Sequence, residues 1–74
     1  MTVNMGRTYR ILGYRSSVNA AWRQKLLTMG ILPGATIDII RVAPRGDPVQ
    51  IRTRRVSLAV RQRDLADIIL QEIV

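Results

Sequence analysis

The sequence of 74 residues contains no cysteine, no histidine and no phenylalanine. Without cysteine the chain can form no disulfide, and without cysteine or histidine it lacks the thiolate and imidazole ligands of ordinary zinc sites. A chain this short buries only about 60% of the surface of its unfolded state, so its stability must come from efficient side-chain packing. We expect one domain over residues 1–74, with a core over about residues 7–73.

Long apolar stretches are also absent. No apolar run approaches the roughly 20 residues that a membrane-spanning helix needs. The first six residues lack the charged segment followed by an apolar segment that is typical of a secretory signal. These observations favour a cytoplasmic protein.

Groups that could perform catalysis are scarce. A serine or threonine nucleophile needs histidine, lysine or a tuned carboxylate as its base, but histidine is absent and lysine occurs once, at Lys25. The five glycines stand apart from one another, so there is no glycine-rich loop to hold phosphates. The sequence therefore predicts no enzyme and no cofactor. An arginine donated to the GTPase site of another protein remains physically possible, and no particular arginine is favoured.

Acidic side chains are too few and too dispersed for an evident metal site. The nearest pair is Asp64 and Asp67, which share one face if residues 62–66 form a helical turn. Transition-metal sites draw on histidine, cysteine or clustered carboxylates. Aspartates at the ends of helices and turns commonly cap backbone groups instead. We interpret both as capping residues and predict no direct metal binding.

Positive charge is abundant. Twelve basic residues against five acidic ones give a formal net charge of +7, and eleven of the twelve are arginines. Such a balance favours anionic partners, which include nucleic acid, an acidic protein face and an anionic membrane surface. Charge alone does not choose among these three.

The pattern of apolar residues predicts mainly β-structure. Alternation predicts a strand over residues 7–12, and β-branched residues predict strands over 36–43 and 49–53. A helix is expected between the first two strands, with Ser16 or Ser17 as its N-cap and Gly30 just after its end. A fourth strand over 56–61, a helical turn over 62–66 and a strand over 68–74 complete a small, partly closed barrel of about five strands.

The sequence also resembles the ferrous iron transport protein A family, called FeoA. Three segments carry the resemblance. Residues 23–34 hold the helix end with its Pro-Gly turn, and residues 41–48 hold the hairpin with its Gly-Asp-Pro loop. Residues 54–61 hold the fourth strand with its arginine-rich start. Together with the closing turn that contains Asp64, they extend the resemblance over about residues 7–73. It implies an SH3-like β-barrel with one inserted helix after the first strand.

The resemblance also implies a function and a partner. A FeoA protein would be a small cytosolic accessory of the permease that imports Fe²⁺ and carries a cytosolic GTP-binding domain. It would dock on this permease and modulate its assembly or its activity. The family is associated with transition metals, although the chain itself offers no evident iron ligands. Since related domains occur at the end of iron-dependent repressors, the fold alone does not fix the role.

Two groups of residues are candidates for partner binding. On a helical wheel Leu27 lies nearly opposite Trp22 and Met29, so we expect it to be exposed beside Arg23, with Ile31 and Leu32 enlarging an apolar anchor. Five arginines on neighbouring strands and their ends are expected to form one basic patch: Arg52, Arg54, Arg55, Arg61 and Arg63. The plain alternative for both groups is a solvated outer surface.

A basic nucleic-acid-binding barrel is the competing function. The charge and the arginine-rich strands favour it, since small barrels often bind single strands. Such binding uses aromatic side chains on which bases stack, and residues 52–63 contain none. We therefore expect no nucleic-acid partner. The oligomeric state is left open, with residues 68–73 as an edge strand where a second copy could pair.

Overall fold

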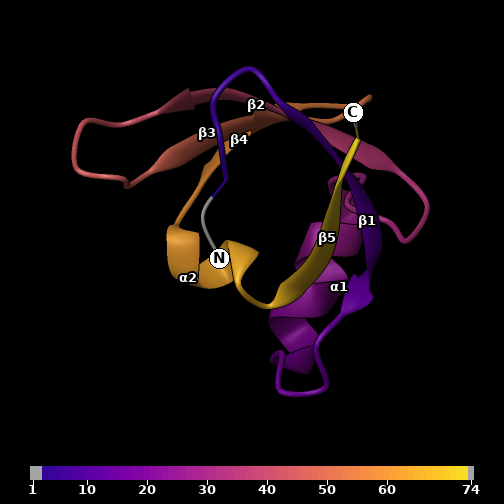
Figure 1. The fold of residues 1–74 in the computed structure, drawn as a ribbon. Coiled ribbons are helices and arrows are strands. Elements are labelled where there is room, and N and C mark those ends of the chain that lie inside the picture. The colour runs from indigo at the N-terminus through magenta and orange to yellow at the C-terminus, as the bar shows by residue number, and fades with distance from the viewer. Residues whose placement is uncertain (1–2, 74) are drawn as a thin grey trace.

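The computed structural model describes residues 3–73 and is built mainly of β-strands (Figure 1). All strand pairs are antiparallel, and the order across the sheet is β4-β3-β2-β1-β5. This arrangement confirms the mainly-β, five-stranded fold with a helix after the first strand. In chain order the elements are β1 (Thr8–Tyr14), α1 (Ala20–Thr28), β2 (Thr36–Val42), β3 (Val49–Arg52), β4 (Ser57–Val60), α2 (Gln62–Leu65) and β5 (Ile68–Ile73).

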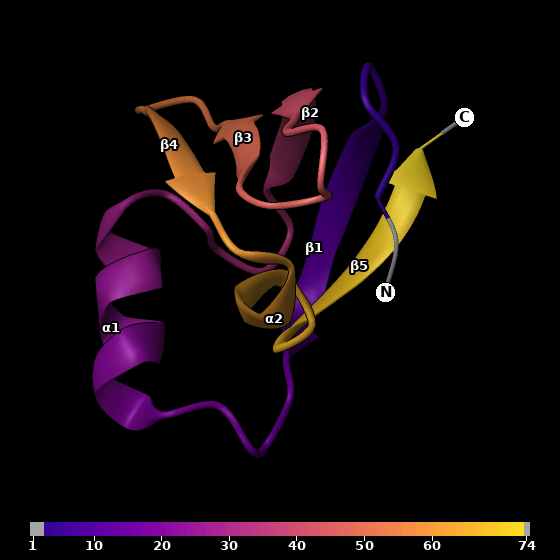
Figure 2. The same ribbon diagram turned by 90° about the vertical axis from the view of Figure 1, so that its left-hand side faces the viewer.

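The sheet curls strongly but does not close into a complete barrel. The pairing register shifts between Ile11 and Gly13 on β1 and between Ile39 and Arg41 on β2. Such bulges bend and twist the strands that carry them. Figures 1 and 2 show the curled sheet with both helices on its concave side. The two end strands β4 and β5 remain unpaired with each other, so the sheet keeps two edges.

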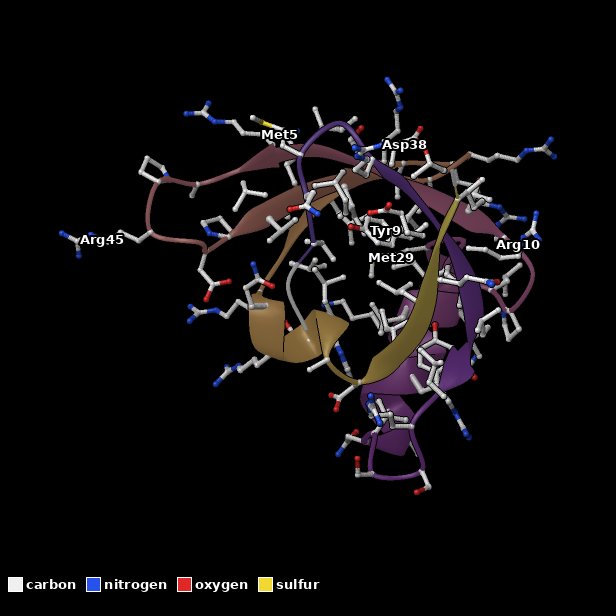
Figure 3. All side chains as sticks on the ribbon, in the orientation of Figure 1. Met5, Tyr9, Arg10, Met29, Asp38 and Arg45 are labelled. Carbon is white, nitrogen blue, oxygen red and sulfur yellow. The ribbon has the colours of Figure 1, made fainter. Side chains whose placement is uncertain are left out.

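The core lies inside this curl. Tyr9 and Ile11 of β1 point inward, as the alternating pattern predicts, and both are buried. Figure 3 shows Tyr9 and Met29 in the interior, whereas Arg10 and Arg45 project outward. Trp22 is half-buried and packs against the core. The buried apolar residues are Val3, Tyr9, Ile11, Leu26, Ile31, Ile37, Ile39, Val49, Ile51, Val60, Leu65 and Ile68.

The helix begins later than its expected serine caps. Asn19 is the N-cap, and its side-chain oxygen accepts hydrogen bonds from the backbone N–H groups of Ala21 and Trp22 at 2.9 and 3.1 Å. Residues 15–18 form a turn instead, in which the N–H of Val18 donates to the carbonyl of Arg15. The prediction of Ser16 or Ser17 as the N-cap was therefore wrong. Serine and asparagine are nearly equal as N-caps, so cap preference does not distinguish these positions.

The end of the helix follows the sequence prediction. Gly30 has φ 92°, its N–H donates to the carbonyl of Leu27, and the N–H of Ile31 donates to that of Leu26. These two bonds form a Schellman motif, in which the residue with positive φ is normally glycine. Ile31 is thereby folded back onto Leu26, and both are fully buried.

The strand and turn boundaries differ from the predictions by small amounts. β1 continues beyond the expected end at residue 12 to Tyr14, because a bulge accommodates Gly13 within the strand. α2 is the expected single helical turn, and β5 begins at Ile68 as expected. Val74, the expected last strand residue, lies outside the described residues. None of the helices described over residues 3–73 is long and apolar enough to cross a bilayer.

Candidate docking surface

A groove of about 470 Å³ separates the loop after α1 from the turn between β3 and β4. Its apolar part comes from Leu32, whose side chain is 43% exposed, and from Ala35. Its charged part comes from the exposed side chains of Arg54 and Arg55. The complete lining is Gly30, Leu32, Gly34, Ala35, Thr36, Arg54 and Arg55.

Thr53 joins the two walls of this groove. It is 8% exposed, and its hydroxyl proton is shared between the carbonyl oxygens of Met29 and Val56, at 3.1 and 3.2 Å. The same hydroxyl oxygen accepts hydrogen bonds from the N–H groups of Arg55 and Val56, both at 3.2 Å. One buried side chain therefore fixes the turn that carries Arg54 and Arg55 against the end of α1.

Gly30 lets the walls approach this closely. A Cβ atom at this position would lie 3.3 Å from the Thr53 Oγ1 atom and 3.6 Å from the side chain of Arg55. Its φ of 92° is also one that other residues rarely adopt. Conformation and space thus both favour glycine at this point of the groove.

Replacing Gly30 with alanine is expected to lower the free energy of unfolding by about 2 kcal/mol, because a side chain is strained at this φ and crowds Thr53. Urea denaturation followed by the fluorescence of Trp22 measures the loss. Gly13→Ala is the matched control: Gly13 has no positive φ and an added Cβ would meet nothing within 4 Å. Equal losses in the two variants would contradict the explanation.

Within the part of the chain that the structure describes, the arginines of the groove have no acidic partner. Among residues 3–73 the one ion pair joins Arg52 to Asp38 at 3.4 Å, on the exposed outer face of the sheet. Arg54 and Arg55 lie beside the C-terminal end of α1, where the helix dipole favours positive charge. The groove thus combines an exposed leucine with two unpaired guanidinium groups, which suits an acidic protein surface with an apolar projection.

The helix side of the predicted anchor differs from the expectation. Leu27 is half-buried and Arg23 is exposed. Ile31 is fully buried, so its prediction as a docking residue was wrong: the Schellman motif turns its side chain into the core. Leu32, the next residue, is the apolar side chain that this loop presents to solvent. The docking role of Arg23 and Leu27 stays a prediction.

Tyr14 stabilises the same loop from beneath. Its hydroxyl donates a hydrogen bond to the carbonyl oxygen of Ile31. Burial raises the pKa of Tyr14, and the nearby positive charge of Arg23 opposes this shift. The phenol consequently keeps its proton throughout the neutral range and remains a donor to the loop.

The five arginines of the expected basic patch fall into separate groups. Arg54 and Arg55 precede β4 at the groove, whereas Arg61 and Arg63 follow β4 at α2. Arg52 lies on the outer face of β3 and pairs with Asp38. The length of β4 therefore separates Arg54 and Arg55 from Arg61 and Arg63, so the five arginines do not form one patch.

Several groove residues were absent from the sequence predictions. Thr53 had been placed in a strand, and no role was expected for Ala35 or Thr36. A threonine directly before a two-arginine turn is a local signal for a side chain that bonds its own turn. The contact of Thr53 with Met29 has no such signal, because it joins residues 24 positions apart.

The carboxylates do not gather into a metal site. Within residues 3–73 no three side chains of the types that ligate metals come together. Asp64 accepts a hydrogen bond from the N–H of Arg61 at 3.3 Å, and Asp47 accepts one from the N–H of Gln62 at 2.7 Å. Both carboxylates therefore satisfy the backbone at the start of α2.

The chain is similar to proteins of one family. The family model described as the FeoA domain matches residues 2–72. A Pseudomonas aeruginosa protein solved by NMR is 44% identical, with 99% of this chain and 97% of that chain covered and a TM-score of 0.73. A FeoA-like protein from Clostridium acetobutylicum is 30% identical, with 97% and 81% covered and a TM-score of 0.82.

A third solved structure is the iron(II) transport protein A of Clostridium thermocellum. It is 30% identical to this chain and has a TM-score of 0.85. The alignment covers 96% of this chain but 43% of the other, so this chain corresponds to less than half of that protein.

Proposed function

Because this chain belongs to the FeoA family, we propose that it is a small accessory protein of ferrous iron uptake that docks on the cytosolic GTP-binding domain of the Fe²⁺ permease. Docking modulates the assembly or the activity of that permease. The name of the C. thermocellum relative, iron(II) transport protein A, supports the link to Fe²⁺ transport.

The observation that carries the docking role is the groove beside Thr53. Leu32 presents an apolar side chain at its edge, and Arg54 and Arg55 present two positive charges that form no ion pair within residues 3–73. Apolar anchors surrounded by charge are typical of binding surfaces, because the anchor supplies affinity while the charges select and steer the partner. The proposed partner surface is therefore acidic, with an apolar side chain that enters the groove.

The protein acts by binding in this proposal, and two of its threonine hydroxyl groups have structural partners. Thr8 donates to Asp38 at 2.7 Å, and Thr28 donates to the carbonyl of Lys25, also at 2.7 Å. The second oxygen of Asp38 accepts a hydrogen bond from Arg52 at 3.4 Å.

The competing nucleic-acid function has less support from the geometry. Its bases would need aromatic side chains on the basic outer face of the sheet. All three aromatic residues lie elsewhere: Tyr9 is buried, Tyr14 bonds the loop after α1, and Trp22 packs against the core. A single-stranded RNA control keeps this alternative open to experiment.

The test is calorimetric titration of this protein into the permease reconstituted in nanodiscs, and into its isolated GTP-binding domain, with and without nucleotide. Binding to both at physiological salt supports the proposed function. Binding to RNA alone, with an affinity that falls steeply as salt rises, contradicts it in favour of the alternative. Binding to neither target nor RNA also contradicts docking on the permease.

Charge reversal in the groove is expected to weaken this binding. The double variant Arg54→Glu with Arg55→Glu should lose about tenfold in affinity, because two attractive contacts become repulsive. The control Arg7→Glu with Arg45→Glu changes the net charge equally at exposed positions outside the groove lining. Figure 3 shows Arg45 projecting from the β2–β3 hairpin. Equal losses in both double variants would mean that overall charge, and not the groove, determines binding.

A further inference from the structure

β4 is an edge strand with one free side. It pairs with β3 and forms one end of the sheet, as Figure 2 shows. Strand edges present unpaired N–H and C=O groups that can accept another strand. The free side of β4 is therefore a backbone surface whose hydrogen bonds are available to a partner.

The hydrogen-bond pattern identifies the groups that face outward. The N–H of Thr53 donates to the carbonyl of Val56, so these two residues form a hydrogen-bonded pair at the turn. Such pairs alternate along an antiparallel ladder. The next hydrogen-bonded pairs are therefore Ile51 with Leu58 and Val49 with Val60. It follows that Ser57 and Ala59 direct their N–H and C=O groups to the free side.

Arginines stand at both ends of this free side. Arg54 and Arg55 precede β4, and Arg61 and Arg63 follow it. All four are exposed, and none belongs to the ion pair recorded among residues 3–73. At about 3.3 Å per residue, Arg55 and Arg61 are about 20 Å apart along the strand. The small side chains of Ser57 and Ala59 leave the backbone between these charges accessible.

We propose that β4 binds an extended, acidic segment of another protein as an additional strand. Backbone hydrogen bonds to Ser57 and Ala59 would hold the segment in register. Carboxylates about six residues apart in the segment would meet the arginines at the two ends of β4. This inference goes beyond the proposed function, since it does not depend on which protein supplies the segment.

The charge distribution disfavours a second copy of this chain at β4, and it disfavours an acidic segment at the β5 edge. Two copies paired through β4 would bring arginines against arginines at both ends in either orientation, which is unfavourable. At the other edge β5 carries Glu72 and no basic residue, so it lacks a comparable attraction for an acidic segment. The acidic segment at β4 is thus the pairing that the charge distribution favours.

The test uses a capped nine-residue peptide that has two acidic residues at each end of a Thr-Val-Thr-Val-Thr stretch. We expect saturable binding by NMR titration, and amide exchange at Ser57 and Ala59 slowed by about tenfold or more, since both amides become hydrogen-bonded. The amides of Leu58 and Val60 are already bonded to β3 and should change little. The same peptide with amides in place of its carboxylates should bind at least about tenfold more weakly.

Ala59→Pro removes one outward N–H without breaking the ladder with β3, because edge strands accept proline where the N–H faces solvent. It should weaken peptide binding by about tenfold, whereas Ala59→Thr, which keeps the N–H, should bind normally. If Ala59→Pro does not fold, the exchange data on the wild-type protein still decide.

Failure of the acidic peptide to bind, or binding that leaves the amides of Ser57 and Ala59 unprotected, overturns the proposal. The arginines would then only protect the edge from aggregation. Neither result bears on docking to the permease, which is measured separately.

Discussion

Replacing Leu26 with alanine is expected to lower the free energy of unfolding by about 3 to 4 kcal/mol, the largest single effect that we predict. Leu26 is fully buried and packs with Ile31 at the end of α1. Its truncation removes apolar contacts and leaves a cavity that the surrounding sheet can fill only in part. A single core in a chain of this size rarely supplies more than about 3 to 5 kcal/mol, so most of the stability is at stake.

The matched control for this experiment is the neighbouring residue. Leu27 is half-buried on the side of the helix that faces away from the core, so Leu27→Ala should cost about 1 kcal/mol. Urea denaturation monitored by the fluorescence of Trp22 compares the free energies of unfolding of the two variants. A stabilising osmolyte keeps the less stable Leu26→Ala variant folded at the start of the titration. Similar losses at the two positions would show that the helix is not packed as described.

Replacing Thr53 with valine is expected to cost about 3 kcal/mol, although the shape of the side chain hardly changes. The valine cannot bond the carbonyl of Met29 or the N–H groups of Arg55 and Val56. Leaving several partly buried backbone groups without partners costs more than the net value of the hydrogen bonds themselves. The turn with Arg54 and Arg55 should also separate from the end of α1.

Thr53→Ser distinguishes the hydroxyl from the methyl group. Serine keeps the oxygen that joins the two walls, so its cost should be about 1 kcal/mol from the lost methyl contact. Chemical denaturation gives the stability, and NMR shifts of Gly30 and Arg55 report whether the groove keeps its shape. A larger loss for serine than for valine would assign the role of Thr53 to packing instead of hydrogen bonding.

Some parts of the structure could be predicted because their causes are local. The end of α1 depends on Gly30 and the residues next to it, and the Schellman motif closes within six residues. The strands follow from alternation and β-branched residues, which report the inner face of each strand directly. The start of α1 was missed because serine and asparagine offer nearly equal caps within a few positions.

The site was less predictable than the fold. The sequence predicted Ile31 in an exposed apolar anchor next to the helix. The structure places Ile31 in the core. It also leaves Leu32 as the exposed apolar residue of the groove, and it makes Leu27 half-buried where full exposure was expected. A helical wheel gives the angular position of each side chain around the helix axis. It does not show whether a neighbouring loop covers that side chain.

By itself, the sequence determined the mainly-β architecture, the single long helix, the excess of positive charge and the resemblance to the FeoA family, because composition and short-range patterns carry this information. Only the tertiary structure decided that Thr53 joins the turn of Arg54 and Arg55 to the end of α1. It also decided that β4 lies at an edge of the sheet and that the sheet stays open. These features depend on strand register and on the curvature that two bulges impose, which arise from contacts between residues far apart in the chain.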